Sequence, residues 1–135
     1  MKKEIFKTIR LEPFHQLSLL VYCSKDWNGI KKHLDNPKNK NINNWVKHLD
    51  LHLVKNLRTD AHIIVDLKTD QPFIFWIEDK KRDWTFYEGI IHEVIHIVDF
   101  LCKSKGVGQE EVEFRANLGA SIFRKIRKTL DNFKD

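Results

Sequence analysis

The stretch that decides both the fold and the candidate site is residues 85–106, TFYEGIIHEVIHIVDFLCKSKG. It opens with Thr85-Phe-Tyr-Glu88, which is typical of the capping box that satisfies the free amides in a helix's first turn. It ends at Gly106, which can adopt the left-handed conformation that stops a helix. The stretch therefore predicts a helix over residues 85–105. Apolar residues occupy most of its circumference, so we expect the helix to be buried and its histidines to be partly desolvated.

Residues 92–96 of this helix read HEVIH, the H-E-x-x-H pattern that binds zinc in metallopeptidases. His92 and His96 lie about 40° apart around the helix axis, so both imidazoles can reach a single ion. A match by chance is expected roughly 0.02 times in a chain of this composition. The alternative is that both histidines are core residues satisfied by hydrogen bonds. Glu93 is the candidate catalytic residue, a general base for hydrolysis.

A catalytic zinc ion usually has three protein ligands and one open position, so a third ligand is needed. Cys102, six residues past the motif, points away from the histidines and is predicted to be a core residue. Asp99 faces the same way as the histidines and is the candidate for orienting an imidazole from outside the ligand shell. Glu110 and Glu113 follow on the next helix. Glu113 is preferred, because an antiparallel helix brings it to the height of the motif.

Glu113 lies near the start of the last predicted helix, residues 109–130. We expect Ala116 and Ala120 on its inward side, where small side chains would let the two helices approach closely. Asn117, one turn after Glu113, is a candidate for orienting the carboxylate. The alternative is that Glu113 is a solvated carboxylate, favoured near a helix start by the macrodipole.

Three short apolar runs predict β-strands at residues 17–23, 61–67 and 73–78. Turn formers in residues 68–72 predict an antiparallel hairpin between the second and third runs. Apolar spacing predicts an amphipathic helix over residues 42–57, and a shorter helix is expected around residues 27–34. Strands followed by two long helices indicate an α+β fold. We expect a three- or four-stranded sheet packed on the H-E-x-x-H helix, which an antiparallel C-terminal helix follows.

The chain has 135 residues, the usual size of one domain, so residues 1–135 are interpreted as a single domain. Apolar residues make up 41% and charged residues 32%, which suits a globular protein with a polar surface. No stretch reaches the roughly 18 apolar residues of a membrane helix, and the first ten residues lack the apolar block of a secretory signal. Cys23 and Cys102 form no C-x-x-C pair, which argues against a disulfide scaffold. These features predict a cytoplasmic protein without membrane contact.

Residues 92–122 resemble the zincin metallopeptidases whose third zinc ligand is a glutamate. They are most similar to small phage and prophage proteins that carry H-E-x-x-H, a glycine-bearing turn, and then E-x-x-A on the next helix. The second element here is EFRA, beginning at Glu113. The resemblance implies a zincin-like domain that holds Zn²⁺ through His92, His96 and Glu113, with Glu93 as the base. It implies a polypeptide substrate but does not identify it, and no other cofactor is indicated.

Other parts of the chain supply candidates for substrate binding. The strand over residues 73–78 could pair with an extended peptide if it lies at the edge of the sheet. His48 and His52 stand one helical turn apart and are interpreted as a solvated pair. The candidates for stabilising a developing oxyanion are Tyr87, His62 and Arg127.

The leading hypothesis is a zinc-dependent peptidase. The first alternative is a non-catalytic regulatory or host-takeover protein that keeps the zincin fold and binds a partner. The second is a nucleic-acid binder, because the net charge is +5 and the pI is near 9.2. Its affinity would fall steeply with salt. The basic run that would carry it is Arg124, Lys125, Arg127 and Lys128.

Overall fold

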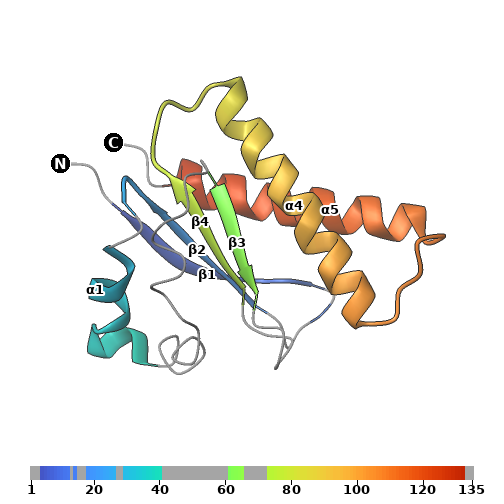
Figure 1. Ribbon diagram of the computed structural model, residues 1–135, viewed down its shortest axis with the longest axis horizontal. Helices are drawn as coiled ribbons and strands as arrows, with labels where there is room; N and C mark the ends of the chain where they lie inside the picture. Colours follow the sequence, from blue (N-terminus) through green and yellow to red (C-terminus); the bar gives the residue numbers. More distant parts are fainter. Residues whose placement is uncertain are drawn as a thin grey trace.

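The computed structural model describes residues 4–12, 14, 18–26, 29–40, 61–65 and 73–132. In this part of the chain, two long helices, α4 (Trp84–Ser104) and α5 (Val112–Asp131), cover one face of a four-stranded sheet (Figure 1). A short helix, α1 (Ile30–Leu34), lies on the other side of the sheet and is followed by the 3-10 turn η2 (Pro37–Asn39). The predicted α+β class is confirmed.

The sheet has the order β1-β2-β4-β3. Its strands are β1 (Ile5–Arg10), β2 (Ser18–Ser24), β3 (Ala61–Val65) and β4 (Phe73–Glu78). β1 and β2 pair antiparallel, β2 and β4 pair parallel, and β3 and β4 pair antiparallel. The antiparallel pairing predicted for the second and third apolar runs is therefore confirmed.

The strand β2 lies inside the sheet and is covered on both faces. All its residues from Leu19 to Ser24 are buried, as the apolar run predicted. Its neighbour β1 was not predicted from the sequence. Only Ile5 and Ile9 of β1 are buried, and the exposed Lys7 between them breaks the alternation that would have marked a half-buried strand.

The suggested peptide-binding role of residues 73–78 is wrong, because β4 is not an edge strand. It pairs with β2 along one side and with β3 along the other. Its main-chain groups are therefore used within the sheet, and a substrate strand cannot pair with them. Sequence periodicity identifies a strand but does not specify its neighbours.

Helix α4 is capped two residues before the expected cap, Thr85. Its N-cap is Asp83, whose carboxylate accepts a hydrogen bond from the Phe86 amide at 3.0 Å, so the capping box at Thr85 is wrong. The stop at Gly106 is confirmed, with φ of 73°. The Val107 amide donates to the Cys102 carbonyl at 2.8 Å, which is the long bond of a Schellman motif.

The expectation that α4 is buried nearly all round is also wrong. One face packs on the sheet and is buried, as Ile90, Ile97 and Leu101 show. The opposite face is exposed to solvent, and Ile95 retains 63% of its surface there. A helix that covers one face of a sheet buries only the stripe that meets the sheet and its neighbouring helix.

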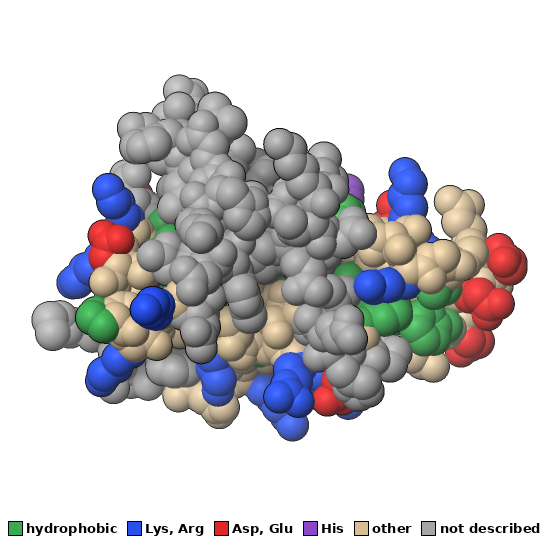
Figure 2. Space-filling view, turned by 90° about the horizontal axis from the view of Figure 1, so that it is seen from below, with side chains coloured by type: hydrophobic (Ala, Val, Ile, Leu, Met, Phe, Trp, Pro, Cys, Tyr) green, Lys and Arg blue, Asp and Glu red, His purple; other side chains and the backbone are tan. Residues whose placement is uncertain are grey.

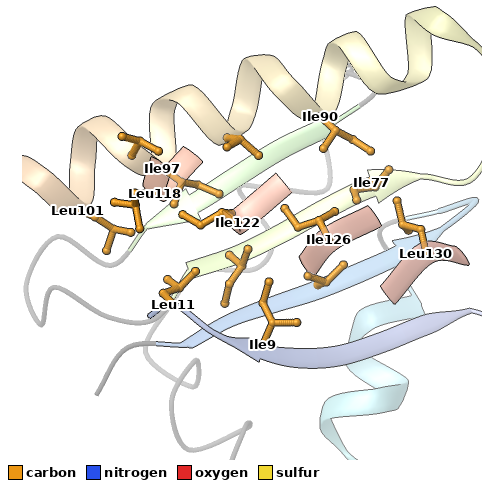
Figure 3. Packing of buried hydrophobic residues seen from close by; sticks show 14 of the residues in the cluster. Ile9, Leu11, Ile77, Ile90, Ile97, Leu101, Leu118, Ile122, Ile126 and Leu130 are labelled. Atoms are coloured by element: carbon orange, nitrogen blue, oxygen red, sulfur yellow. The ribbon is translucent and has the colours of Figure 1, made fainter. Parts of the chain in front are cut away.

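Helix α5 returns beneath α4 in the opposite general direction and crosses it at an angle (Figure 1). Its buried face is centred on Leu118, Ile122 and Ile126, which enter the core together with residues of α4 and the sheet (Figure 3). Ala116 and Ala120 are exposed, so the prediction that they lie on the inward side is wrong.

The close approach between the helices is made instead by Gly119. A β-carbon placed at that residue would lie 3.4 Å from Val98 Cγ2 of α4. Gly119, which has no side chain, therefore faces Val98 of α4, and the two exposed alanines lie beside this contact.

Some predictions fall on other parts of the chain. The helix over residues 42–57, with His48 and His52, and the turn over residues 68–72 lie outside the described residues. The short helix expected around residues 27–34 is present as α1 over Ile30–Leu34, and residues 27 and 28 lie outside the described part of the chain. Among the helices that the structure describes, none is long and apolar enough to cross a membrane.

Candidate metal centre

The two imidazoles of the H-E-x-x-H motif converge on one point. His92 Nε2 and His96 Nε2 lie 3.2 Å apart, and the rings meet at 75° with centroids 4.8 Å apart. Two nitrogens at this separation, each at the usual zinc distance of about 2.0–2.1 Å, would subtend about 100° at a shared ion. That angle is close to tetrahedral. Without an ion, the same separation suits a hydrogen bond in which one Nε2–H donates to the other ring.

We call these two side chains the imidazole pair. Both His92 and His96 are exposed, so the prediction that they are desolvated is wrong. They project from the face of α4 opposite the sheet, where solvent and ions can reach them. Glu93, the candidate base, follows His92 directly and is half-buried.

Among the described residues, no third ligand lies beside the imidazole pair. Within the described residues, no three or more His, Cys, Asp or Glu side chains are close enough together to hold a metal ion. Glu113 lies in the first turn of α5 and is exposed, and Asn117 is exposed one turn later. The two histidines fit a shared ion, and the carboxylate predicted to join them stands apart.

Asp99 has a partner that the sequence did not suggest. Its Oδ1 accepts a hydrogen bond from an Arg115 NH₂ group at 2.8 Å, which joins α4 to α5. This carboxylate therefore contacts a guanidinium rather than an imidazole. Sequence reasoning missed Arg115, although its position between Glu113 and Ala116 in the EFRA element was a possible signal.

The described end of the molecule at the α4–α5 turn is acidic. Glu110 and Glu111 precede α5, Glu113 lies in its first turn, and all three are exposed. Figure 2 shows acidic side chains gathered at this end beside a hydrophobic patch. The negative charges also lie near the positive end of the α5 dipole, which stabilises them.

The cysteines are not positioned as metal ligands. Cys23 and Cys102 are free, and both are buried. Burial raises the pKa of the Cys23 thiol to about 12 and also raises the pKa of the Cys102 thiol. Both side chains therefore stay protonated at neutral pH, whereas zinc binds the thiolate. The prediction that Cys102 is a core residue is confirmed.

Two of the candidate oxyanion donors contact each other. The Arg127 guanidinium carbon lies 6.0 Å from the centroid of the Tyr87 ring, and the Tyr87 ring packs edge-on against Phe86. Arg127 also lies 3.8 Å from Asp131 of the same helix. The side chain of His62, the third candidate, lies outside the described residues.

A cavity of about 610 Å³ opens between α4 and α5 next to the imidazole pair. His96, Asp99 and Arg115 line it, together with apolar side chains of both helices. His96 thus belongs both to the candidate metal site and to the cavity wall.

Comparison with known proteins gives no assignment, because no family model, curated protein or solved structure matches this chain.

Proposed function

We propose that this chain is a zincin-like, zinc-dependent peptidase whose metal is held by His92 and His96. The observation that carries the proposal is the 3.2 Å separation of the two Nε2 atoms on the exposed face of one helix. Core histidines would be expected to face buried hydrogen-bond partners. These two face each other in solvent, at a separation that suits two ligands of one tetrahedral ion.

Glu113 is the proposed third ligand. On α5 it lies about 20° from Ala120 around the helix axis, and Ala120 lines the cavity that His96 also lines. Glu113 therefore shares a face of α5 with this cavity-lining residue and lies about 10 Å nearer the start of the helix. Asn117 is the proposed residue that orients the Glu113 carboxylate by hydrogen bonding, whereas Asp99, predicted to orient an imidazole, is paired with Arg115 and joins the two helices.

Glu93, His92 and His96 have different roles in the proposed reaction. A bound Zn²⁺ supplies Lewis acidity, which lowers the pKa of water toward 7 and polarises a carbonyl. The Glu93 carboxylate accepts the water proton and later passes it to the leaving amine. His92 and His96 would hold the metal through the lone pairs of their Nε2 atoms. Exposure of the pair leaves room for a polypeptide to approach.

Metal analysis of the purified protein tests the proposal. We expect about one zinc per chain in the wild type and in Glu93→Gln, because Glu93 is not a ligand. We expect no retained zinc in His96→Ala. The same metal content in all three proteins would contradict the site.

A non-catalytic binding protein with the same fold is the second candidate. It is favoured by the position of Glu113, which the structure does not group with the imidazole pair. A search for cleaved peptides after incubation with a mixed peptide pool distinguishes the two candidates, with Glu93→Gln as the inactive control. Cleavage that depends on Glu93 supports the peptidase, and zinc binding without cleavage supports the binding protein.

Nucleic-acid binding is less well supported, because part of the basic run is already engaged. Lys125 Nζ donates to the Arg10 carbonyl at 2.9 Å, and Arg127 pairs with Asp131. We further propose a cytoplasmic location, which suits two free thiols.

A further inference from the structure

The cavity between α4 and α5 has two apolar walls. Helix α4 contributes Ile91, Val94, Ile95 and Val98. Helix α5 contributes Ala116, Gly119, Ala120 and Phe123. Among the described residues, the walls belong to two long helices that pack on the same core. Such preformed apolar cavities are typical sites for organic ligands.

The small residues of α5 keep this cavity open. Ala116 and Ala120 do not reach across to α4, while Gly119 lets the helix backbones approach beside Val98. As a result, Ile91 and Ile95 of α4 remain 42% and 63% exposed. Apolar side chains left in water beside a cavity gain free energy when an apolar group covers them.

The polar groups at the wall restrict the charge of a ligand. Asp99 and Arg115 pair with each other, so together they carry no net charge. The Arg115 guanidinium has five N–H donors and no acceptor, and the Asp99 bond uses one of its NH₂ groups. A ligand that meets this pair needs one hydrogen-bond acceptor and no formal charge.

The volume restricts the size of the ligand. A cavity of about 150 Å³ lined by Leu, Ile and Phe holds benzene. This cavity has about 610 Å³, within the range of roughly 300–1,000 Å³ that is usual for organic ligands. A group larger than a single aromatic ring can therefore enter.

We infer that the α4–α5 cavity binds a neutral, largely apolar organic group of two or three rings, with an acceptor directed at Arg115. This binding goes beyond the proposed peptidase function and does not require a metal. His96 lies at the boundary between the two sites, so a ligand in the cavity would lie beside the imidazole pair.

Fluorescence titration with 6-propionyl-2-(dimethylamino)naphthalene, a neutral two-ring probe whose carbonyl oxygen is a hydrogen-bond acceptor, tests the inference. The full chain is titrated in buffer containing EDTA, so that metal plays no part. We expect saturable binding at one site, with enhanced emission from the apolar surroundings. Absence of saturable binding would overturn the inference.

Two variants at one exposed wall position locate the probe. Ala120→Phe fills the cavity without touching the core and should weaken binding at least tenfold. Ala120→Ser keeps the volume and should stay within threefold of the wild type. Equal binding by the wild type and a folded Ala120→Phe protein, as judged by circular dichroism, would also overturn the inference. Because the buffer contains EDTA, probe binding does not depend on zinc. Failure of the cavity proposal can therefore be distinguished from failure of the proposed metal site.

Discussion

The protein places histidine in two contrasting environments. His33 of α1 stacks on Phe6 with centroids 4.9 Å apart, meets the edge of Tyr22, and contacts the Glu4 carboxylate through Nε2. We call these four residues the His33 cluster. In the imidazole pair of α4, by contrast, the two Nε2 atoms face each other and the rings are exposed.

The difference separates a structural histidine from a candidate ligand. In the His33 cluster the ring packs against Phe6 and Tyr22 and contacts the Glu4 carboxylate. In the imidazole pair the two facing nitrogens cannot both carry a proton without opposing their N–H groups. A divalent cation resolves this opposition, because it accepts both lone pairs.

The largest expected effect is on zinc affinity. Removal of one imidazole by His92→Ala should weaken zinc binding by more than about 100-fold, because loss of an outer-shell partner alone costs about 10–100-fold. His33→Ala should change the affinity less than twofold. Competition with a chromophoric chelator measures the zinc affinity of both variants. Equal losses of affinity would contradict the distinction between the His33 cluster and the imidazole pair.

The next effect concerns alkaline stability of the His33 cluster. Burial raises the pKa of Tyr22 from 10.0 to about 12. The unfolded chain therefore loses this phenolic proton first, and the tyrosine's contribution to stability disappears as pH rises from about 10 to 12. In that window the wild type should lose up to about 1.4 kcal/mol of unfolding free energy per pH unit more than Tyr22→Phe. Urea unfolding at several pH values measures the free energy of unfolding of both proteins. The same pH dependence in the wild type and in Tyr22→Phe would contradict the prediction.

A smaller effect is expected on stability at neutral pH. His33→Ala removes a ring stack on Phe6 and a partly exposed hydrogen bond to Glu4, which should cost about 1 kcal/mol. In EDTA, His92→Ala should cost less than about 0.5 kcal/mol, because an exposed side chain away from the core is removed. Chemical denaturation measures the free energy of unfolding of both variants. A larger loss in His92→Ala would show that the imidazole pair is structural.

The smallest effect is expected at Asp99. Asp99→Asn weakens a partly exposed ion pair with Arg115 and should cost about 0.5 kcal/mol. Because this carboxylate joins α4 to α5, zinc affinity should change less than about threefold. Loss of a group that orients an imidazole would instead reduce zinc affinity by about 10–100-fold. A tenfold loss would instead assign Asp99 to the support of a histidine.

Local features of the fold were predictable from the sequence. The apolar run of β2 marked a strand covered on both faces, and Gly106 marked the end of α4. The start of α4 was misplaced because Asp83 and Thr85 are both good capping residues, two positions apart. Strand order depends on pairings distant in the sequence, so the interior position of β4 could not be read from periodicity.

In the candidate site, too, the local feature was predictable from the sequence and the feature that depends on packing was not. Helix geometry alone brings His92 and His96 together, since residues four apart share a face. The position of Glu113 depends on how α5 packs, and there Leu118 and Ile122 rather than the alanines form the buried face. A sequence pattern with several small residues did not show which side of α5 would meet the core.

X-ray absorption at the zinc edge of the zinc-loaded, dialysed protein tests the central claim most directly. The account predicts one bound zinc with two imidazole nitrogens at about 2.0–2.1 Å, oxygen in the remaining positions and no sulfur. Zinc that is lost on dialysis, or zinc bound without two imidazoles, would contradict it.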